Sequence, residues 1–288
     1  MAEITAQLVK QLRDMTGAGM MDCKKALLET NGDIEAAVEF LRKAGIAKAA
    51  KKLDREAKDG RIEAVLSEDG KKGAMIALSS ETDFVAKNDE FIDFAKKLAM
   101  LSMEKAIASV EELEKISLGE KTVSDAITEL IAKIGENIKL RKVEYFDAND
   151  GGFVLQYIHP GNKVGVMVEL STSASSDERV RNLAKEIAMQ IAFSNPVAVS
   201  RSEVPQEVIE KEKKLYEEQA REEGKPDAAI PKIVEGRLRK FLEENCLLEQ
   251  EYIRDSDKKI FDLIDDTSRE VGEEISVRRF VRFEIGAA

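Results

Sequence analysis

The sequence predicts an α+β protein in which a small N-terminal helical bundle precedes a duplicated core of strands and helices, interrupted by a helical hairpin. Three observations predict this fold: glycine-separated helical patterns in the first 45 residues, two matching strand-turn-strand segments, and a charged insertion in the second copy. The 288 residues suffice for several domains with buried cores. We expect a bundle at 1–45, a linker at 46–60, one core half at 61–148 and another at 149–288, whose helical insert covers about 200–250.

The N-terminal segment predicts three short helices joined by tight glycine turns. The first apolar helical face comprises Ile4, Leu8, Leu12 and Met15. A second helix covers 20–29, and Asp33 caps a third that we expect to reach Lys43. Met20 and Met21 follow the first glycine loop, and the sequence favours a core role and a contact role equally, because Met packs well in both.

The rest of the chain repeats itself. Residues 73–79 (GAMIALS) match 165–171 (GVMVELS) at an offset of 92, and 95–100 (AKKLAM) match 184–189 (AKEIAM) at an offset of 89. A third block, 135–143 (GENIKLRKV), matches 272–280 (GEEISVRRF) at an offset of 137. Two copies of one strand-strand-helix-strand unit are therefore expected, each built around a Gly-containing hairpin.

The offsets show where the copies differ. The first copy gains three residues within 81–91 (ETDFVAKNDEF), where Phe84 stands among charges. The second copy gains 48 residues, most of them at 205–245. This insert predicts two antiparallel helices with a break at 224–227. Their apolar stripes comprise Val208, Ile209, Leu215 and Tyr216 in one helix and Ile230, Val234, Leu238, Phe241 and Leu242 in the other. Such a projecting coiled-coil hairpin usually contacts a partner or a second subunit, and the alternative is a hairpin that packs only on its own domain.

Composition excludes several classes of protein. The net charge of −11 opposes direct nucleic-acid binding, and no apolar run is long enough to span a membrane. The N-terminus lacks the basic and apolar regions of a secretory signal, so we expect a cytoplasmic protein. Cys23 and Cys246 are far apart and have no partner at metal-ligand spacing, which predicts two reduced thiols.

A catalytic centre is not expected. The one histidine, His159, lies in a predicted hairpin turn, and on position alone it is an exposed turn residue. The sequence contains neither a GxxxxGK[ST] phosphate loop nor a strand-borne GxGxxG. We therefore predict a protein that is not an enzyme and holds no metal or cofactor of its own.

The whole chain, in order, resembles the elongation factor Ts family. The resemblance is carried by the first 45 residues with their TGAGMMDCKKAL segment, by TDFVAKN at 82–88, KIGENIKLR at 133–141, NKVGVMVEL at 162–170, GKP at 224–226 with VEGRLRKF at 234–241, and RFEIG at 282–286. The sequence ends shortly after that last motif, so we expect no contacts from the extra C-terminal helix that some members carry.

The resemblance implies a guanine nucleotide exchange factor for elongation factor Tu. It implies a UBA-like N-terminal bundle that docks on the GTPase, and a segment that dislocates the GTPase's magnesium ion, here Thr82, Asp83, Phe84 and Val85. It also implies partner contacts at Arg13, Met20, Met21 and His159, and for His159 this reverses the preference drawn from position.

Alternatives from other classes are an assembly protein, in which bundle and hairpin only oligomerise, and a hydrolase, which the missing nucleophile and base disfavour. The residues leave open whether the factor is a homodimer or forms a 2:2 complex with the GTPase.

Overall fold

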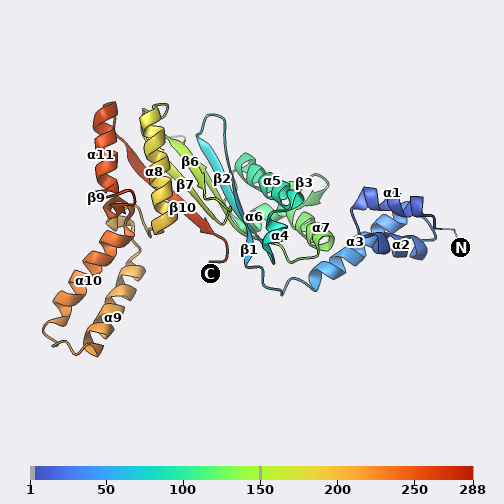
Figure 1. The fold of residues 1–288 in the computed structure, drawn as a ribbon, viewed down its shortest axis with the longest axis horizontal. Coiled ribbons are helices and arrows are strands. Elements are labelled where there is room, and N and C mark those ends of the chain that lie inside the picture. The colour runs from blue at the N-terminus through green and yellow to red at the C-terminus, as the bar shows by residue number, and fades with distance from the viewer. Residues whose placement is uncertain (1–3, 149–150, 288) are drawn as a thin grey trace. The chain divides into compact units, whose positions relative to one another are not determined.

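The computed structural model describes residues 4–148 and 151–287 (Figure 1). The helices are α1 (Ala6–Thr16), α2 (Met20–Glu29), α3 (Ile34–Ala50), α4 (Asp83–Ala86), α5 (Asp89–Lys105), α6 (Val110–Lys115), α7 (Val123–Ile134), α8 (Glu178–Ser194), α9 (Gln206–Glu222), α10 (Ile230–Asn245) and α11 (Ile260–Val271), with 3-10 turns at Arg201–Glu203 and Leu247–Glu249. The strands are β1 (Asp59–Leu66), β2 (Lys72–Ser80), β3 (Ser117–Leu118), β4 (Lys121–Thr122), β5 (Lys139–Asp147), β6 (Phe153–Ile158), β7 (Val164–Ser171), β8 (Glu251–Tyr252), β9 (Asp255–Lys259) and β10 (Ser276–Glu284).

The strands form small sheets, which confirms the predicted α+β class. One three-stranded sheet has the order β1-β2-β5 and another the order β10-β7-β6, while β3-β4 and β8-β9 are two-stranded. The chain divides into two compact units, one formed by Met1–Glu63, Met75–Glu144 and Glu284–Ala288, the other by Ala64–Ala74 and Tyr145–Phe283. The expected division between core halves, after residue 148, adjoins residues 149–150, which lie outside the described residues.

The N-terminal bundle of three helices forms as predicted. Thr5 caps α1 and Asp33 caps α3, each accepting a hydrogen bond from a backbone N–H of the first turn. The small core of the bundle comprises Val9, Leu12, Cys23, Ala26, Leu27 and Ala37. The prediction that Met15 belongs to the apolar face of α1 is wrong, because Met15 is exposed. Val9 is buried instead, three residues before Leu12 on the inner face of the helix.

Helix α3 continues seven residues beyond the predicted end at Lys43. Its last two turns pack against α7 of the same unit. A Cβ atom on Gly45 would lie 3.1 Å from Cβ of Ala132, so the missing side chain permits a close approach of the two helices. Ala49, one turn further, is buried. The extension therefore depends on a tertiary contact rather than on a local signal.

The duplication is confirmed by the bounds of the elements, but the predicted strand-strand-helix-strand unit lacked a second helix, which is α7 in the first copy and α11 in the second. Helices α5 and α8 begin and end 89 positions apart, while α7 and α11, like β5 and β10, begin and end 137 positions apart. The copies also share an unusual glycine. Gly60 and Gly152 both have positive φ, and an added Cβ would lie 2.2 Å from the Leu78 carbonyl oxygen and 1.9 Å from that of Leu170, respectively. Both pairs are 92 positions apart, so the same close backbone approach occurs in each copy.

The second unit has its main core between a sheet and two helices. Strands β6 and β7 pair antiparallel, with Phe153 opposite Leu170. Helices α8 and α11 cover these strands (Figure 1), and the shared core includes Phe153, Val168, Ile187 and Ile264. The β7 residues in this core, Val166, Val168 and Leu170, stand at alternate positions and so share one face of the sheet, while the residues between them are buried as well.

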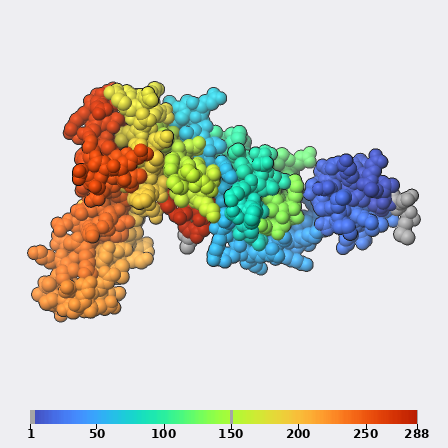
Figure 2. Space-filling model, viewed as in Figure 1, coloured from blue at the N-terminus to red at the C-terminus, as the bar shows by residue number. Residues whose placement is uncertain are grey.

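The inserted helical hairpin forms as predicted from α9 and α10. Space-filling atoms show it projecting from the rest of its unit (orange in Figure 2). Ala220, Ile230 and Val234 form a small cluster near its tip. Leu215, which the sequence pattern placed on the apolar stripe, is exposed, because the buried face of α9 runs from Ile209 through Tyr216 to Ala220 at helical spacing.

Candidate functional site

The candidate site is centred on α4, a single helical turn that the second copy lacks. Thr82 caps it, with its Oγ1 accepting a hydrogen bond from the N–H of Val85 at 3.4 Å. Asn88 then caps α5, so the turn is closed at both ends by short polar side chains. Ala86 is buried, whereas Phe84 is 81% exposed. A large apolar side chain is therefore held out in solvent on a capped turn.

A carboxylate from elsewhere in the chain holds the start of this turn. Glu136, two residues after α7, accepts hydrogen bonds from the N–H groups of Glu81 at 3.1 Å and of Thr82 at 3.0 Å. Its other oxygen accepts the Thr82 hydroxyl at 2.7 Å. A hydrogen bond to a charged acceptor has a net value of about 1.5–3 kcal/mol. The three bonds together fix the backbone that leads into α4.

Neighbouring residues extend this anchor. The N–H of Asn137 donates to Glu81 Oε1 at 2.7 Å, and Arg55 forms an ion pair with the Glu81 carboxylate at 3.5 Å. Asn137 is fully buried, and its Nδ2 donates to the carbonyls of Arg55 at 2.6 Å and Leu53 at 3.2 Å. The segment after α3, the end of β2 and the segment after α7 are thus joined by hydrogen bonds.

Asp83 and Lys87 lie on the exposed side of the turn. Their side chains form an ion pair at 2.6 Å, one helical turn apart. The hydrogen bond to Asp83 raises the pKa of Lys87 above its usual range. Because both side chains are exposed, this pair contributes little to stability.

The equivalent place in the second copy shows what the first copy added. There, Glu273 matches Glu136 at the offset of 137, and it accepts a hydrogen bond from the Ser173 hydroxyl at 2.6 Å. The strand-to-helix connection is three residues shorter, and Asp177 caps α8 without an intervening helical turn. The carboxylate anchor is therefore common to both copies, and the exposed Phe84 is not.

The N-terminal residues Arg13, Met20 and Met21 are all exposed. Met20 and Met21 are the first two residues of α2 and are 56% and 77% exposed, respectively. They do not belong to the core of the bundle, so the core role that the sequence left open is wrong. Arg13 lies in the last turn of α1, where Gly17 ends the helix with a left-handed conformation. These side chains lie on both sides of one glycine loop.

Helix α7 connects this loop with the anchored turn inside the first unit. A Cβ atom on Gly17 would lie 2.5 Å from Cε of Lys133, so the loop touches α7. Lys133 also pairs with Glu90, in the first turn of α5, at 2.6 Å. Glu136 follows three residues later. The bundle and the turn that carries Phe84 are thus held by the same helix.

His159 lies in the second unit, in the turn between β6 and β7. Its ring is exposed, and Nδ1 is 2.9 Å from the hydroxyl of Tyr157. The backbone N–H of His159 donates a hydrogen bond to the carbonyl of Val164. Asn162 adopts a left-handed backbone conformation, which closes the turn. The exposed position fits either of the roles considered from sequence.

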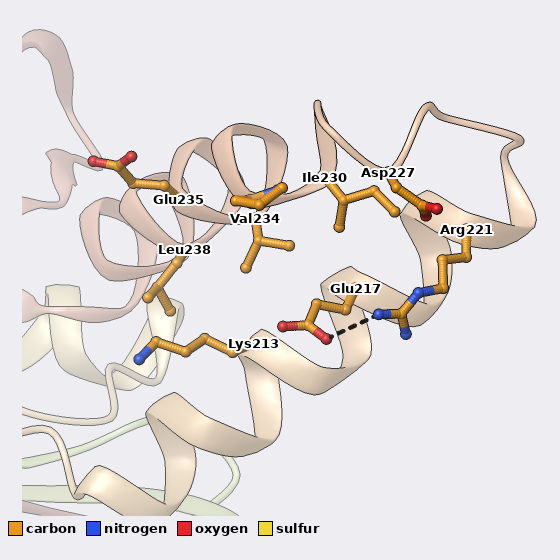
Figure 3. A pocket seen from close by; sticks show the side chains of 9 residues that line it. Lys213, Glu217, Arg221, Asp227, Ile230, Val234, Glu235 and Leu238 are labelled. Atoms are coloured by element: carbon orange, nitrogen blue, oxygen red, sulfur yellow. Dashed lines mark ion pairs between the residues drawn. The ribbon is translucent and has the colours of Figure 1, made fainter.

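A groove of about 700 Å³ runs along the helical hairpin (Figure 3). Apolar side chains of α10 face charged side chains of α9 across it, with Glu217 and Arg221 paired at 3.5 Å. The groove is lined by Lys213, Glu217, Arg221, Asp227, Ile230, Pro231, Val234, Glu235 and Leu238.

Within residues 4–148 and 151–287, no group of three or more His, Cys, Asp or Glu side chains is placed to hold a metal ion. Both cysteines are free and buried, and burial raises the pKa of the Cys246 thiol. Among the helices of the same described residues, none combines the length and the apolar composition needed to cross a bilayer.

Sequence reasoning singled out the exposed turn but missed its anchor. The signal for Glu136 was present, because the Gly-Glu pair at 135–136 recurs at 272–273 in the second copy. Recurrence marks this pair as part of the shared scaffold, and its contact with the turn depends on the fold.

Comparison with known proteins agrees with this architecture. Residues 4–41 match the family described as UBA/TS-N domain, and residues 81–287 match the family described as Elongation factor TS. The chain is 50% identical over 285 residues to elongation factor Ts of Clostridium perfringens (strain SM101 / Type A), covering 98% of this chain and 93% of that protein. It is equally identical, with the same coverage, to the elongation factor Ts of Clostridium botulinum (strain Alaska E43 / Type E3).

A more distant relative, elongation factor Ts of Chlorobium phaeobacteroides (strain BS1), is 45% identical over 291 residues and is covered over its full length. The helical bundle, the duplicated α+β core and these matches define the class: the protein is a translation elongation factor. Within that class, the chain belongs to the elongation factor Ts family.

Proposed function

We propose that this elongation factor is a guanine nucleotide exchange factor, which binds elongation factor Tu in its GDP-bound form and promotes GDP release. The observation that carries the proposal is Phe84, 81% exposed on a turn that Glu136 anchors. An exposed aromatic side chain on a fixed backbone is costly in water and is suited to insertion into another protein.

The mechanism follows from how a GTPase holds its nucleotide. Backbone amides bind the phosphates, and a magnesium ion bridges phosphate oxygens to the protein. Phe84, entering between packed helices of the GTPase, shifts the elements that position these ligands. Asp83 hydrogen-bonds the partner's backbone beside this wedge, and Thr82 and Val85 complete the turn that presents both side chains. The GTPase loses magnesium and then GDP, while this protein needs neither a metal nor a catalytic group of its own.

Binding energy for the distorted state comes from the rest of the interface. We assign partner contacts to Arg13, Met20 and Met21 at the loop of the bundle and to His159 at the β6–β7 turn, all of them exposed. We further assign residues 1–45 to docking, 61–148 to exchange, and 149–288, including the hairpin, to additional contacts. By linkage, GDP weakens binding of the factor as much as the factor weakens binding of GDP.

The proposal places the protein in the cytoplasm, with elongation factor Tu as its partner, and without a nucleic acid or membrane partner. Purified chain is mixed with GDP-loaded elongation factor Tu and passed over a sizing column, and the nucleotide content of the complex is measured. A nucleotide-free complex supports exchange. A self-assembled chain that ignores the GTPase supports an assembly protein instead, and the mass of the complex distinguishes 1:1 from 2:2 stoichiometry.

A further inference from the structure

The turn that carries Phe84 cannot hold its own conformation. Helix α4 has four residues, and a helical turn of this length has too few hydrogen bonds to persist alone. Phe84 contributes almost no packing, because most of its side chain is in solvent. The order of the turn must therefore come from contacts at its ends.

At the C-terminal end Ala86 is buried, and the polar contacts are modest. Arg61 donates from Nη1 to the carbonyl of Ala86 at 3.3 Å, and Asn88 caps the helix that follows. At the N-terminal end Glu136 makes three hydrogen bonds, two of them to consecutive backbone N–H groups. Its carboxylate also orients the Thr82 hydroxyl that caps α4. Glu136 is therefore the largest single restraint on the direction in which Phe84 points.

The second copy supports this assignment independently. Glu273 occupies the same position after α11 and reaches the corresponding connection, through Ser173, with no exposed aromatic residue to position. A carboxylate at this position is therefore present in both copies, and only the first copy places an exposed aromatic side chain beside it.

We propose that Glu136 is a positioning residue for nucleotide exchange, which acts on the GTPase only through the backbone of residues 81–82 and the orientation of Phe84. This inference rests on the proposed function. A turn that is already ordered loses little conformational entropy when its side chain enters the partner. Loss of the anchor therefore lowers the maximal rate of GDP release more than it weakens the initial encounter, which the bundle provides.

The test uses the full-length chain with Glu136→Ala, and Glu273→Ala as the matched control. Glu136→Gln is the conservative variant, since its carbonyl oxygen still accepts from the backbone. Thermal unfolding of each variant verifies that it is folded. Because the chain contains no tryptophan, Phe84→Trp introduces a single indole whose fluorescence anisotropy reports the order of the turn without a partner. Release of fluorescent GDP from elongation factor Tu is measured separately, with Phe84 in place.

We expect Glu136→Ala to lower the anisotropy of the indole and the maximal release rate, the latter about tenfold, with a change of less than about threefold in the half-saturating concentration. Glu273→Ala should change neither, and Glu136→Gln should restore most of both. Unchanged anisotropy in Glu136→Ala overturns the proposal, as does a maximal rate equal to that of Glu273→Ala. If the wild-type chain does not accelerate release at all, the proposed function is wrong, and the anisotropy alone then decides whether Glu136 orders the turn.

Discussion

Replacement of Phe84 by alanine should change the stability of the free protein very little and its nucleotide-exchange activity much more. About a fifth of the Phe84 side chain is removed from water in the free protein, since 81% is exposed. Complete burial of a phenylalanine side chain is worth about 1.5–3 kcal/mol, so Phe84→Ala should cost about 0.5 kcal/mol of unfolding free energy or less. The variant should therefore fold and melt almost as the wild type does.

The effect on exchange should be much larger. If the exposed four fifths of the side chain become buried in the distorted GTPase, about 2 kcal/mol of the stabilisation of that state is lost in Phe84→Ala. A loss of that size corresponds to about a 30-fold lower maximal rate of GDP release. Because the wedge acts in the distorted state, the half-saturating concentration should change less than the maximal rate.

The assay is stopped-flow release of a fluorescent GDP analogue from elongation factor Tu, over a range of factor concentrations that reaches saturation. Phe193→Ala is the matched control, because Phe193 at the end of α8 is 78% exposed and lies outside the anchored turn. It should leave the maximal rate unchanged. Wild-type maximal rates for Phe84→Ala at saturation, or an equal loss for both variants, would refute the reasoning.

Further predictions concern the hairpin, pH and the duplicated glycine. Excision of residues 205–245, closed by a short linker, should leave the remaining core folded and alter partner affinity or stoichiometry in sedimentation measurements; unaltered values for both would count against an interface role. The hydrogen bond from Arg179 lowers the pKa of Asp177 from 3.8 to about 2. Because the ionised Asp177 carboxylate is favoured in the folded protein, its contribution to stability should be complete above pH 3.8 and lost as the pH falls through about 2. An NMR titration that gives Asp177 a pKa near 3.8 would contradict this. Gly152→Ala should lower the free energy of unfolding by more than about 3 kcal/mol, because its Cβ would overlap a backbone carbonyl. The control Gly151→Ala, also at positive φ but in open space, should lower it by about 1 kcal/mol. Equal losses in chemical denaturation would contradict the overlap.

Much of the fold could be predicted because the core of the chain is an internal duplication. The offset of 89 placed α8 relative to α5, and the offset of 137 placed β10 relative to β5, whereas the second helix of each copy, α7 or α11, is missing from the predicted unit. Repeated patterns are informative because both copies satisfy the same packing requirements. The difference between the offsets located α4 as well, since an addition to a repeated scaffold appears as a change of spacing.

The parts that sequence could not supply depend on tertiary contacts. The length of α3 was underestimated because Gly45 and Ala49 look unremarkable locally and matter only against α7. The exposure of Met20 and Met21 could not be decided, because methionine packs equally well in a core and against a partner. The role of Glu136 was hidden because its partners are 54 and 55 positions away.

The proposed function requires this elongation factor to accelerate the release of GDP from elongation factor Tu. The most direct test preloads elongation factor Tu with fluorescent GDP and mixes it with the wild-type chain in an excess of unlabelled GDP. The release rate should rise with factor concentration and saturate far above the spontaneous rate. A release rate that stays at the spontaneous value at every concentration of the chain would contradict the claim.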